Sequence, residues 1–258
     1  GACRRTLGCS RHLSFAKLLF QRDNGYRLMI WAANKTARMT GRTVAFELLF
    51  LFVLISGLFS QAASSSINVP SGMTGSDLLR MSQEGKHNDV ALLAPQAIKK
   101  NPQDVDAYIG LAWSLNALKE YAKAKDIAQR GYAMFKDPRL VQALGEAQYY
   151  LGENEAALAN LQEYLAKFPE GSKSALSFYL CGELFVRMVK FNHADIAFST
   201  ALQYNPSNAR WWARLGWVRE KTSRYLAALK AYDQAVSLNP TLEDALTGKS
   251  RMLAKIED

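Results

Sequence analysis

Side chains that could act as nucleophiles, general bases or soft metal ligands are few and widely spaced in this sequence. Cysteine and histidine together occupy six positions: Cys3, Cys9, His12, His87, Cys181 and His193. A zinc site needs several such ligands at short spacings, and a phosphate-binding loop needs a glycine-rich run in front of a helix. The sequence contains neither arrangement. We therefore predict no catalytic residue, no metal ligand and no cofactor, and we expect the chain to act by binding.

The elements that would present a binding surface are marked by five Xaa-Pro steps in the last two thirds of the chain. Successive prolines lie 36, 31, 37 and 34 residues apart, in the steps Asn101-Pro102, Asp137-Pro138, Phe168-Pro169, Asn205-Pro206 and Asn239-Pro240. Proline cannot continue a helix and pushes its predecessor out of the α region, so each step is predicted to end a helix. A period near 34 indicates stacked helical hairpins.

Between the prolines, small and large residues return at fixed positions. Counted from Ala209, positions 4, 7, 8, 20, 27 and 32 hold Trp212, Leu215, Gly216, Ala228, Ala235 and Pro240. This pattern resembles the tetratricopeptide repeat, and only Arg219 departs from it, because position 11 usually holds an aromatic residue. The preceding interval matches as well, with Cys181 at position 7, where a buried hydrophobe is expected.

The resemblance predicts an all-α, right-handed superhelical solenoid of about five helical hairpins. We expect the hairpins over residues 71–104, 105–137, 138–171, 175–208 and 209–242, with a capping helix at 243–258. The first hairpin matches the pattern least well. Small residues at positions 8, 20 and 27 let the two helices of a unit approach closely, and stacking of units supplies the core that one hairpin lacks.

The amino-terminal quarter of the chain reads as a targeting segment. Residues 44–59 are apolar apart from Glu47 and Ser56, which is short for a bilayer span and typical of a signal-peptide core. We predict a signal peptide or membrane anchor at 39–62, with cleavage before Ala63, followed by a linker at 63–75. Residues 1–38 are then a non-native upstream extension or part of a leader. With the repeats, this arrangement resembles exported bacterial tetratricopeptide proteins.

The predicted location is periplasmic or otherwise exported, and two alternatives remain open. The apolar run can stay uncleaved and anchor the repeats in a membrane, in which case residues 44–59 are the expected membrane contact. Alternatively, the basic stretch before it can act as an organellar transit peptide.

The net charge does not indicate a nucleic-acid partner once it is located along the chain. The formal charge is +9, but residues 1–43 carry nine Lys or Arg and one acidic residue. The remainder has 23 basic and 22 acidic residues and is nearly neutral. Because a nucleic-acid surface needs basic side chains on the folded domain, no nucleic-acid partner is predicted.

The resemblance implies that positions 2, 5, 9 and 12 of each first helix line a concave groove. With Arg214 beside them, the predicted partner-binding residues are Trp113, Asn116, Arg139, Gln142, Glu146, Tyr149, Tyr179, Glu183, Arg210, Arg214 and Trp217. Aromatic residues and arginine are frequent anchors of interfaces. The four aromatic residues are expected to form a strip along the groove.

This groove does not match the family's mode of clamping a terminal carboxylate, which uses Lys and Asn at positions 5 and 9. Glu146 and Glu183 occupy position 9 here and would repel a carboxylate. We therefore predict a non-enzymatic adaptor that holds a segment or helix of a protein from an envelope complex. A self-associating structural protein and a carrier of a small or lipidic ligand remain alternatives.

Overall fold

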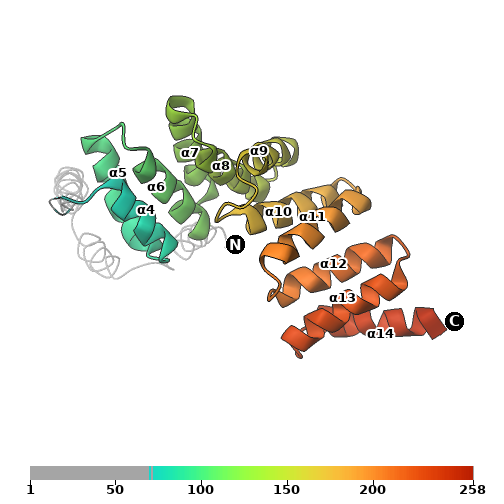
Figure 1. Cartoon of the computed structure of the whole chain (residues 1–258). Coiled ribbons are helices and arrows are strands. Elements are labelled where there is room, and N and C mark those ends of the chain that lie inside the picture. The colour runs from blue at the N-terminus through green and yellow to red at the C-terminus, as the bar shows by residue number, and fades with distance from the viewer. Residues whose placement is uncertain (1–69, 71, 258) are drawn as a thin grey trace, which may run out of the picture. The chain divides into compact units, whose positions relative to one another are not determined.

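The computed structural model describes residue 70 and residues 72–257. Over these residues every regular element is an α-helix. In chain order the helices are α4 (Gly75–Gln83), α5 (His87–Lys100), α6 (Val105–Ala117), α7 (Tyr121–Phe135), α8 (Pro138–Leu151), α9 (Asn154–Lys167), α10 (Ser174–Arg187), α11 (Phe191–Tyr204), α12 (Ala209–Lys221), α13 (Tyr225–Leu238) and α14 (Glu243–Glu257) (Figure 1). The predicted all-α repeat fold is thereby confirmed.

The targeting predictions for residues 1–38 and 39–62, and the first part of the linker at 63–75, lie outside the described residues. Within the described part of the chain, no helix combines the length and the apolar character that a membrane span requires.

The helix ends predicted from the proline steps are confirmed. Helices α5, α9, α11 and α13 end immediately before the residue that precedes a proline, for example α5 at Lys100 before Asn101-Pro102. Helix α7 ends at Phe135, and Pro138 then starts α8 as its first helical residue. Proline is favourable there because its fixed φ suits a helix and its missing N–H has no intrahelical partner to lose.

Most of the first helices of the hairpins begin with a side-chain cap. The side chains of Thr74, Asp104, Asp137 and Asn208 accept backbone N–H groups at the starts of α4, α6, α8 and α12. These caps satisfy donors that the first helical turn leaves without partners. Helix α10 differs, because its N-cap is Lys173, which has no side-chain cap.

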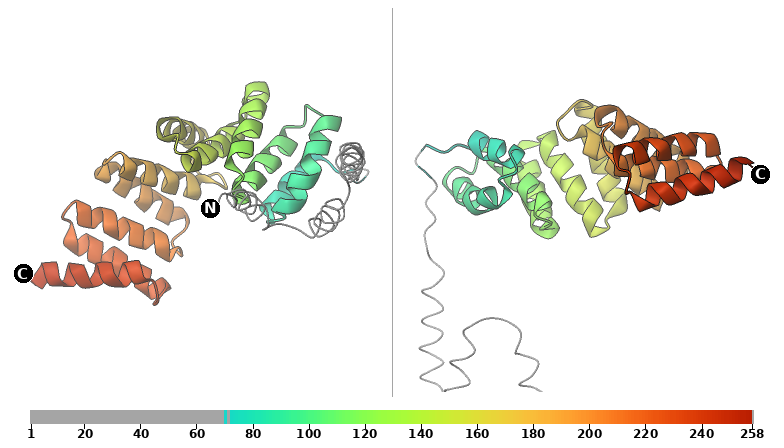
Figure 2. Two further views of the ribbon diagram at one scale, coloured as in Figure 1. Left: turned by 180° about the vertical axis from the view of Figure 1, so that it is seen from behind. Right: turned by 90° about the horizontal axis from the view of Figure 1, so that it is seen from below.

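The hairpins stack in chain order over residues 72–257 (Figures 1 and 2). Each pairs two consecutive helices, from α4 with α5 to α12 with α13, and α14 packs on both α12 and α13. First helices also contact their neighbours, except that α10 and α12 approach mainly through side chains, such as the stacked rings of Tyr179 and Trp211. Buried hydrophobic clusters fill the space between successive helices.

Glycine at position 8 lets the two helices of a hairpin approach closely. A Cβ on Gly182 would lie 2.5 Å from the Phe198 ring, and one on Gly216 would lie 2.9 Å from the Tyr232 ring. Such separations are far below van der Waals contact, so alanine does not fit without a shift. The glycine series therefore serves packing.

The exception to the repeat pattern, Arg219 at position 11, has a specific partner. Its Nε donates to Asp195 Oδ1 of the preceding hairpin at 2.8 Å, and both side chains are largely buried. An ion pair between α12 and α11 thus takes the place of aromatic packing.

Candidate binding groove

A cavity of about 610 Å³ lies on the first-helix side of the carboxyl-terminal hairpins. Helices α10 and α12 form its base, and α14 with the turn before it forms a wall. The lining residues are Tyr179, Arg210, Ala213, Arg214, Trp217, Tyr232, Leu242, Glu243, Asp244, Thr247 and Arg251. Four of them, Tyr179, Arg210, Arg214 and Trp217, are predicted groove residues, so the structure brings these four to one cavity.

The aromatic part of the cavity is held rigidly by its neighbours. The Tyr179 ring stacks on Trp211 with centroids 4.8 Å apart and planes 9° from parallel. Burial and the nearby Glu183 carboxylate raise the pKa of the Tyr179 phenol, which therefore stays neutral at physiological pH. Both Tyr179 and Trp217 remain half-buried, so part of each ring faces the cavity.

The partly buried Arg214 and the buried Glu183 beside these rings form a bidentate pair. Arg214 donates from Nε and Nη2 to the two carboxylate oxygens of Glu183, at 2.6 and 2.9 Å. The same guanidinium lies 4.5 Å from the Trp217 ring centroid, and Lys221 Nζ lies 5.2 Å from it. Planar fork-to-carboxylate pairing fixes both side chains, which pre-forms this part of the groove.

Arg210 differs from Arg214 in having no salt-bridge partner among the described residues. It is exposed at the rim of the cavity, one helical turn before Arg214. Its guanidinium is therefore available to an incoming acidic group.

Helix α14 is held against the cavity by a second bidentate pair. Arg251 donates to the two oxygens of Glu220 at 3.1 and 2.8 Å, and the Tyr232 hydroxyl donates to the same carboxylate at 3.0 Å. The hydrogen bond from Arg251 is the main reason that the pKa of Glu220 lies below its usual value. The three helices α12, α13 and α14 are thus tied at one carboxylate.

The other predicted groove residues do not reach this cavity, and most of them are enclosed. Gln142 is fully buried, and Trp113 and Asn116 are each 4 % exposed. Glu146 and Glu183 are buried as well. Asn116 and Gln142 are therefore covered in the free protein, where the Asn116 amide donates to the Ala143 carbonyl of α8 and the Gln142 amide donates to Glu146.

Arg139 and Tyr149 are partly exposed but engaged within the chain. Arg139 forms ion pairs with Asp137 at 2.7 Å and with Asp106 at 3.2 Å. The Arg187 guanidinium lies 4.1 Å from the Tyr149 ring centroid. The predicted aromatic strip is therefore divided: Tyr179 and Trp217 share the cavity, whereas Trp113 lies in the amino-terminal half.

Several cavity residues were absent from the sequence prediction. Glu243, Asp244, Thr247 and Arg251 belong to α14, which the repeat pattern marks only as a cap. The sequence did contain a signal for them: Glu243 follows Ala209 by one repeat length of 34 residues, so α14 occupies the place of a further first helix.

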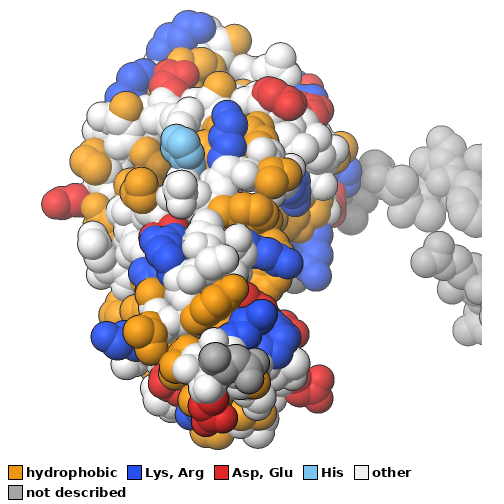
Figure 3. All heavy atoms as spheres, turned by 90° about the vertical axis from the view of Figure 1, so that its right-hand side faces the viewer, with side chains coloured by type: hydrophobic (Ala, Val, Ile, Leu, Met, Phe, Trp, Pro, Cys, Tyr) orange, Lys and Arg blue, Asp and Glu red, His pale blue; other side chains and the backbone are white. Residues whose placement is uncertain are grey.

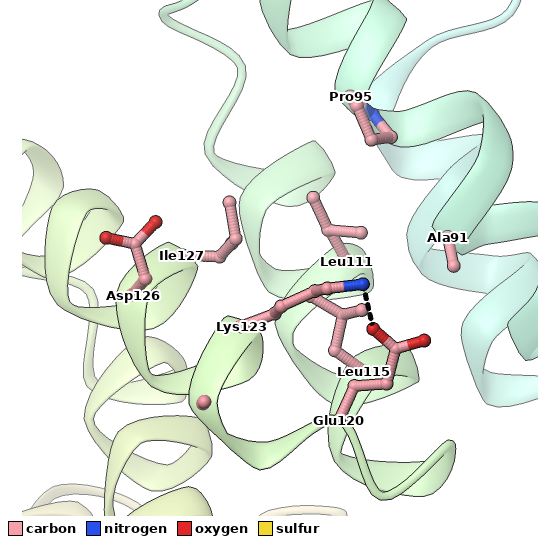
Figure 4. A pocket seen from close by; sticks show the side chains of 9 residues that line it. Ala91, Pro95, Leu111, Leu115, Glu120, Lys123, Asp126 and Ile127 are labelled. Carbon is pink, nitrogen blue, oxygen red and sulfur yellow. Dashed lines mark ion pairs between the residues drawn. The ribbon is translucent and has the colours of Figure 1, made fainter. Parts of the chain in front are cut away.

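A second hollow of about 600 Å³ lies between α5, α6 and α7, with a largely apolar base (Figure 4). Leu111, Leu115 and Ile127 point into it, and the Lys123–Glu120 ion pair stands at its edge. None of its lining residues was predicted as a site.

Basic side chains are not gathered into one patch on the face shown in Figure 3, where Lys and Arg alternate with hydrophobic side chains. Among the described residues, no group of three or more His, Cys, Asp or Glu side chains is placed to hold a metal ion.

Comparison with known proteins identifies the repeats. Two models described as tetratricopeptide repeat match residues 79–179 and 182–243. No curated protein matches the chain.

Solved structures share the fold at low sequence identity. The structure of pilF from Pseudomonas aeruginosa is 18% identical with a TM-score of 0.61, covering 71% of this chain and 85% of that one. MamA is 18% identical with a TM-score of 0.53, covering 67% and 97%. YrrB, described as a TPR protein with an unusual peptide-binding site, is 18% identical with a TM-score of 0.53, covering 68% and 89%. With both repeat models and these neighbours in agreement, the chain belongs to the tetratricopeptide repeat family.

Proposed function

We propose that this protein is a non-enzymatic adaptor that holds a segment of a partner protein in the cavity between α10, α12 and α14. The observation that carries the proposal is the combination of two half-buried aromatic rings, Tyr179 and Trp217, with the free guanidinium of Arg210 in one hollow. Scaffolding by protein interaction is the general role of this repeat fold.

The size and chemistry of the cavity support a peptide segment as the ligand. Its volume of about 610 Å³ lies within the roughly 300–1,000 Å³ that ligand sites occupy. Tyr, Trp and Arg bury a large area with few torsions to restrict, so they are the residues that most often dominate binding. The bidentate pairs at Arg214 and Arg251 hold the walls in place, which lowers the entropic cost of binding.

The charged residues at the rim of the cavity predict the charged side chains of the bound segment. Arg210 favours an acidic side chain, and the exposed Glu243 and Asp244 favour a basic one on the opposite wall. A short extended strand or helix with apolar residues between the two charges satisfies all three positions. The description of YrrB as having a peptide-binding site supports a peptide rather than a small molecule for this chain.

The location in the cell envelope is part of the same proposal and rests on the apolar run at 44–59 with its basic leader. Its test is the amino terminus of the protein recovered from its host. A start near Ala63, determined by mass spectrometry, supports export with cleavage; retention of the apolar run supports an anchored form.

Site-specific photo-crosslinking in the host tests the binding site. A benzoylphenylalanine residue replaces Thr247, which is exposed on the cavity wall, and in a matched control it replaces Ile196, which is 66% exposed on α11. We expect a partner protein to be crosslinked from position 247 and not from position 196. Trp217→Ala is expected to remove that product.

Other products would overturn the proposal in identifiable ways. Equal crosslinking from both positions would show that the cavity is not the binding surface. A product made only of this chain would indicate the self-associating alternative. A co-purified small molecule whose release depends on Trp217 would indicate the carrier.

A further inference from the structure

A cluster of buried polar groups in the amino-terminal half of the groove is not explained by packing. Three side-chain atoms there have no hydrogen-bond partner among the described residues: the indole Nε1 of Trp113 and the carbonyl oxygens of Asn116 and Gln142. A buried polar atom without a partner loses its hydration and gains nothing in return, so such atoms are rare in folded proteins. The two carbonyl oxygens, one on α6 and one on α8, are acceptors that a bound group with N–H donors would satisfy.

The cluster contains more acceptors than donors. The Asn116 amide donates to the Ala143 carbonyl at 2.8 Å, and the Gln142 amide donates to Glu146 at 2.9 Å. Both amide nitrogens are therefore engaged while their carbonyl oxygens remain free. Glu146 adds a buried carboxyl whose pKa is raised by burial. Together, two free carbonyls and a carboxyl beside an indole ring suit a cationic group that carries several N–H donors.

A lysine of the chain stands at the edge of this cluster. Lys173 Nζ lies 4.9 Å from the centroid of the Trp113 ring, although these residues are 60 positions apart. Its charge also acts on Glu146, whose pKa it lowers against the effect of burial, and on His87. No hydrogen bond joins Lys173 to the free acceptors among the described residues.

The position of Lys173 is not explained by the start of α10. Residues 172–174 separate the predicted hairpins 138–171 and 175–208, and they produce the longest proline interval, 37 residues. A lysine at an N-cap faces the positive end of the helix dipole, which is unfavourable. The second helices α5, α11 and α13 also begin at Lys or Arg, but among the first helices α6, α8 and α12 have Asp or Asn there. The insertion brings a cation to the Trp113 ring.

We infer that Trp113, Asn116, Gln142 and Glu146 form a binding site for a lysine or arginine side chain of the partner segment, whose place Lys173 takes in the free protein. When the partner's basic side chain enters, the Lys173 side chain swings into solvent, and the incoming N–H groups reach the carboxyl and the two free carbonyls. This inference rests on the proposed function, because the same segment binds in the groove.

Selection of peptides by the full chain tests the site. A random peptide library is panned against the wild type and against Lys173→Ala, Glu146→Gln and Trp217→Ala. Lys190→Ala is the matched control, because Lys190 is an exposed lysine at the N-cap of α11. The thermal midpoint of every variant is measured, and Glu146→Gln keeps the shape of the side chain, so loss of folding is separated from loss of binding.

We expect the peptides selected by the wild type to be enriched in Lys or Arg at one position. Lys173→Ala is expected to bind them about threefold or more tightly, since it removes the internal competitor. Glu146→Gln is expected to bind them about tenfold more weakly. Replacing the basic residue of a peptide by norleucine is expected to produce the same loss and to abolish the advantage of Lys173→Ala.

The two proposals fail differently in this experiment. Peptides that depend on Trp217 but lack a conserved basic residue and bind Glu146→Gln as tightly as wild type would overturn the cation site and leave the groove adaptor standing. Selection of no peptide, or binding unaffected by Trp217→Ala, would overturn both. An equal gain from Lys190→Ala and Lys173→Ala would show a general charge effect and would also exclude the specific site.

Discussion

Glu146 and Glu183 occupy the same repeat position on α8 and α10, but their carboxyl groups differ in how completely they are paired. Arg214 engages both oxygens of Glu183, whereas Glu146 accepts one amide hydrogen bond from Gln142. A buried carboxylate is tolerated when it is fully paired and is costly when it is not. The repeat pattern places the two glutamates at equivalent positions, but it does not determine the free-energy cost of burying each carboxylate.

Glu146→Gln is expected to stabilise the fold at neutral pH by about 1 kcal/mol, because burial raises the pKa of this carboxyl and its ionised form is held at a cost. A raised pKa means that the native state binds the proton more tightly, so stability falls as pH rises above the usual value of 4.5. The gain should disappear near pH 4. Urea denaturation at both pH values measures it, and an equal gain at both would contradict the prediction.

Glu183→Gln is the matched comparison. It leaves the Arg214 guanidinium partly buried without its carboxylate, so it should destabilise the fold at pH 7 by about 1–3 kcal/mol. If Glu146→Gln and Glu183→Gln change the free energy of unfolding in the same direction, the prediction is wrong, and the different pairing of the two carboxyl groups does not affect stability.

At the scale of the element, the last three hairpins depend on contact between position 8 of the first helix and position 24 of the second. Gly145 lies under Leu161, Gly182 under Phe198 and Gly216 under Tyr232. The size of the side chain at position 24 determines how much space remains for a side chain at position 8. These pairs make the hairpin a rigid unit on which the groove side chains are carried.

Gly182→Ala should destabilise the protein by about 1–3 kcal/mol, although alanine is the better helix former by about 1 kcal/mol, because its Cβ would overlap the Phe198 ring. Adding Phe198→Leu, which replaces the ring by a smaller side chain, should recover part of the loss. Chemical denaturation of the single and double variants measures this coupling. A stabilised Gly182→Ala would show that the ring moves aside freely.

The closing helix offers a second test at this scale. Met252 is fully buried against α13, whereas the neighbouring Leu253 is 42% exposed. Met252→Ala should cost about 2–4 kcal/mol and release α14, while Leu253→Ala should have little effect. Hydrogen exchange should rise in α14 and remain unchanged in α4 to α9, since stacked repeats contact only their neighbours. Faster exchange throughout would instead indicate one cooperative unit.

For the molecule as a whole, the buried thiol of Cys181 reports opening of the central hairpins. Cys181 lies in the cluster formed by α9, α10 and α11, and burial raises the pKa of its thiol to about 12. A thiol in this state is neutral and inaccessible to reagents. Reaction therefore requires the helices to separate.

With Cys3 and Cys9 replaced by serine, the full chain should react with a thiol reagent at pH 8 only at the rate of opening. The reaction should accelerate with urea in step with the loss of helix signal. Leu161→Ala, which removes a buried neighbour of the cluster, should accelerate it at low urea. Rapid labelling of the native wild type would contradict the burial of Cys181.

The family, the helix boundaries and the packing role of the glycines followed from local signals. Proline acts on the residue before it, and a glycine under a large side chain repeats in the last three hairpins, so both are visible as a period. The departure at Arg219 was also visible, but its partner Asp195 was not, because the ion pair joins two hairpins.

The sequence by itself determined that this chain is a stack of helical hairpins and which positions face the first-helix side. Only the tertiary structure decided which of those positions are open. Trp113 and Gln142 are covered in the free protein, whereas Tyr179, Arg210 and Trp217 border a cavity whose other wall is α14. The physical reason is that repeat periodicity encodes contacts within a hairpin and between neighbours, while the spacing of hairpins depends on individual insertions and ion pairs. Lys173 on Trp113 and Arg251 on Glu220 are such contacts, and no local pattern encodes them.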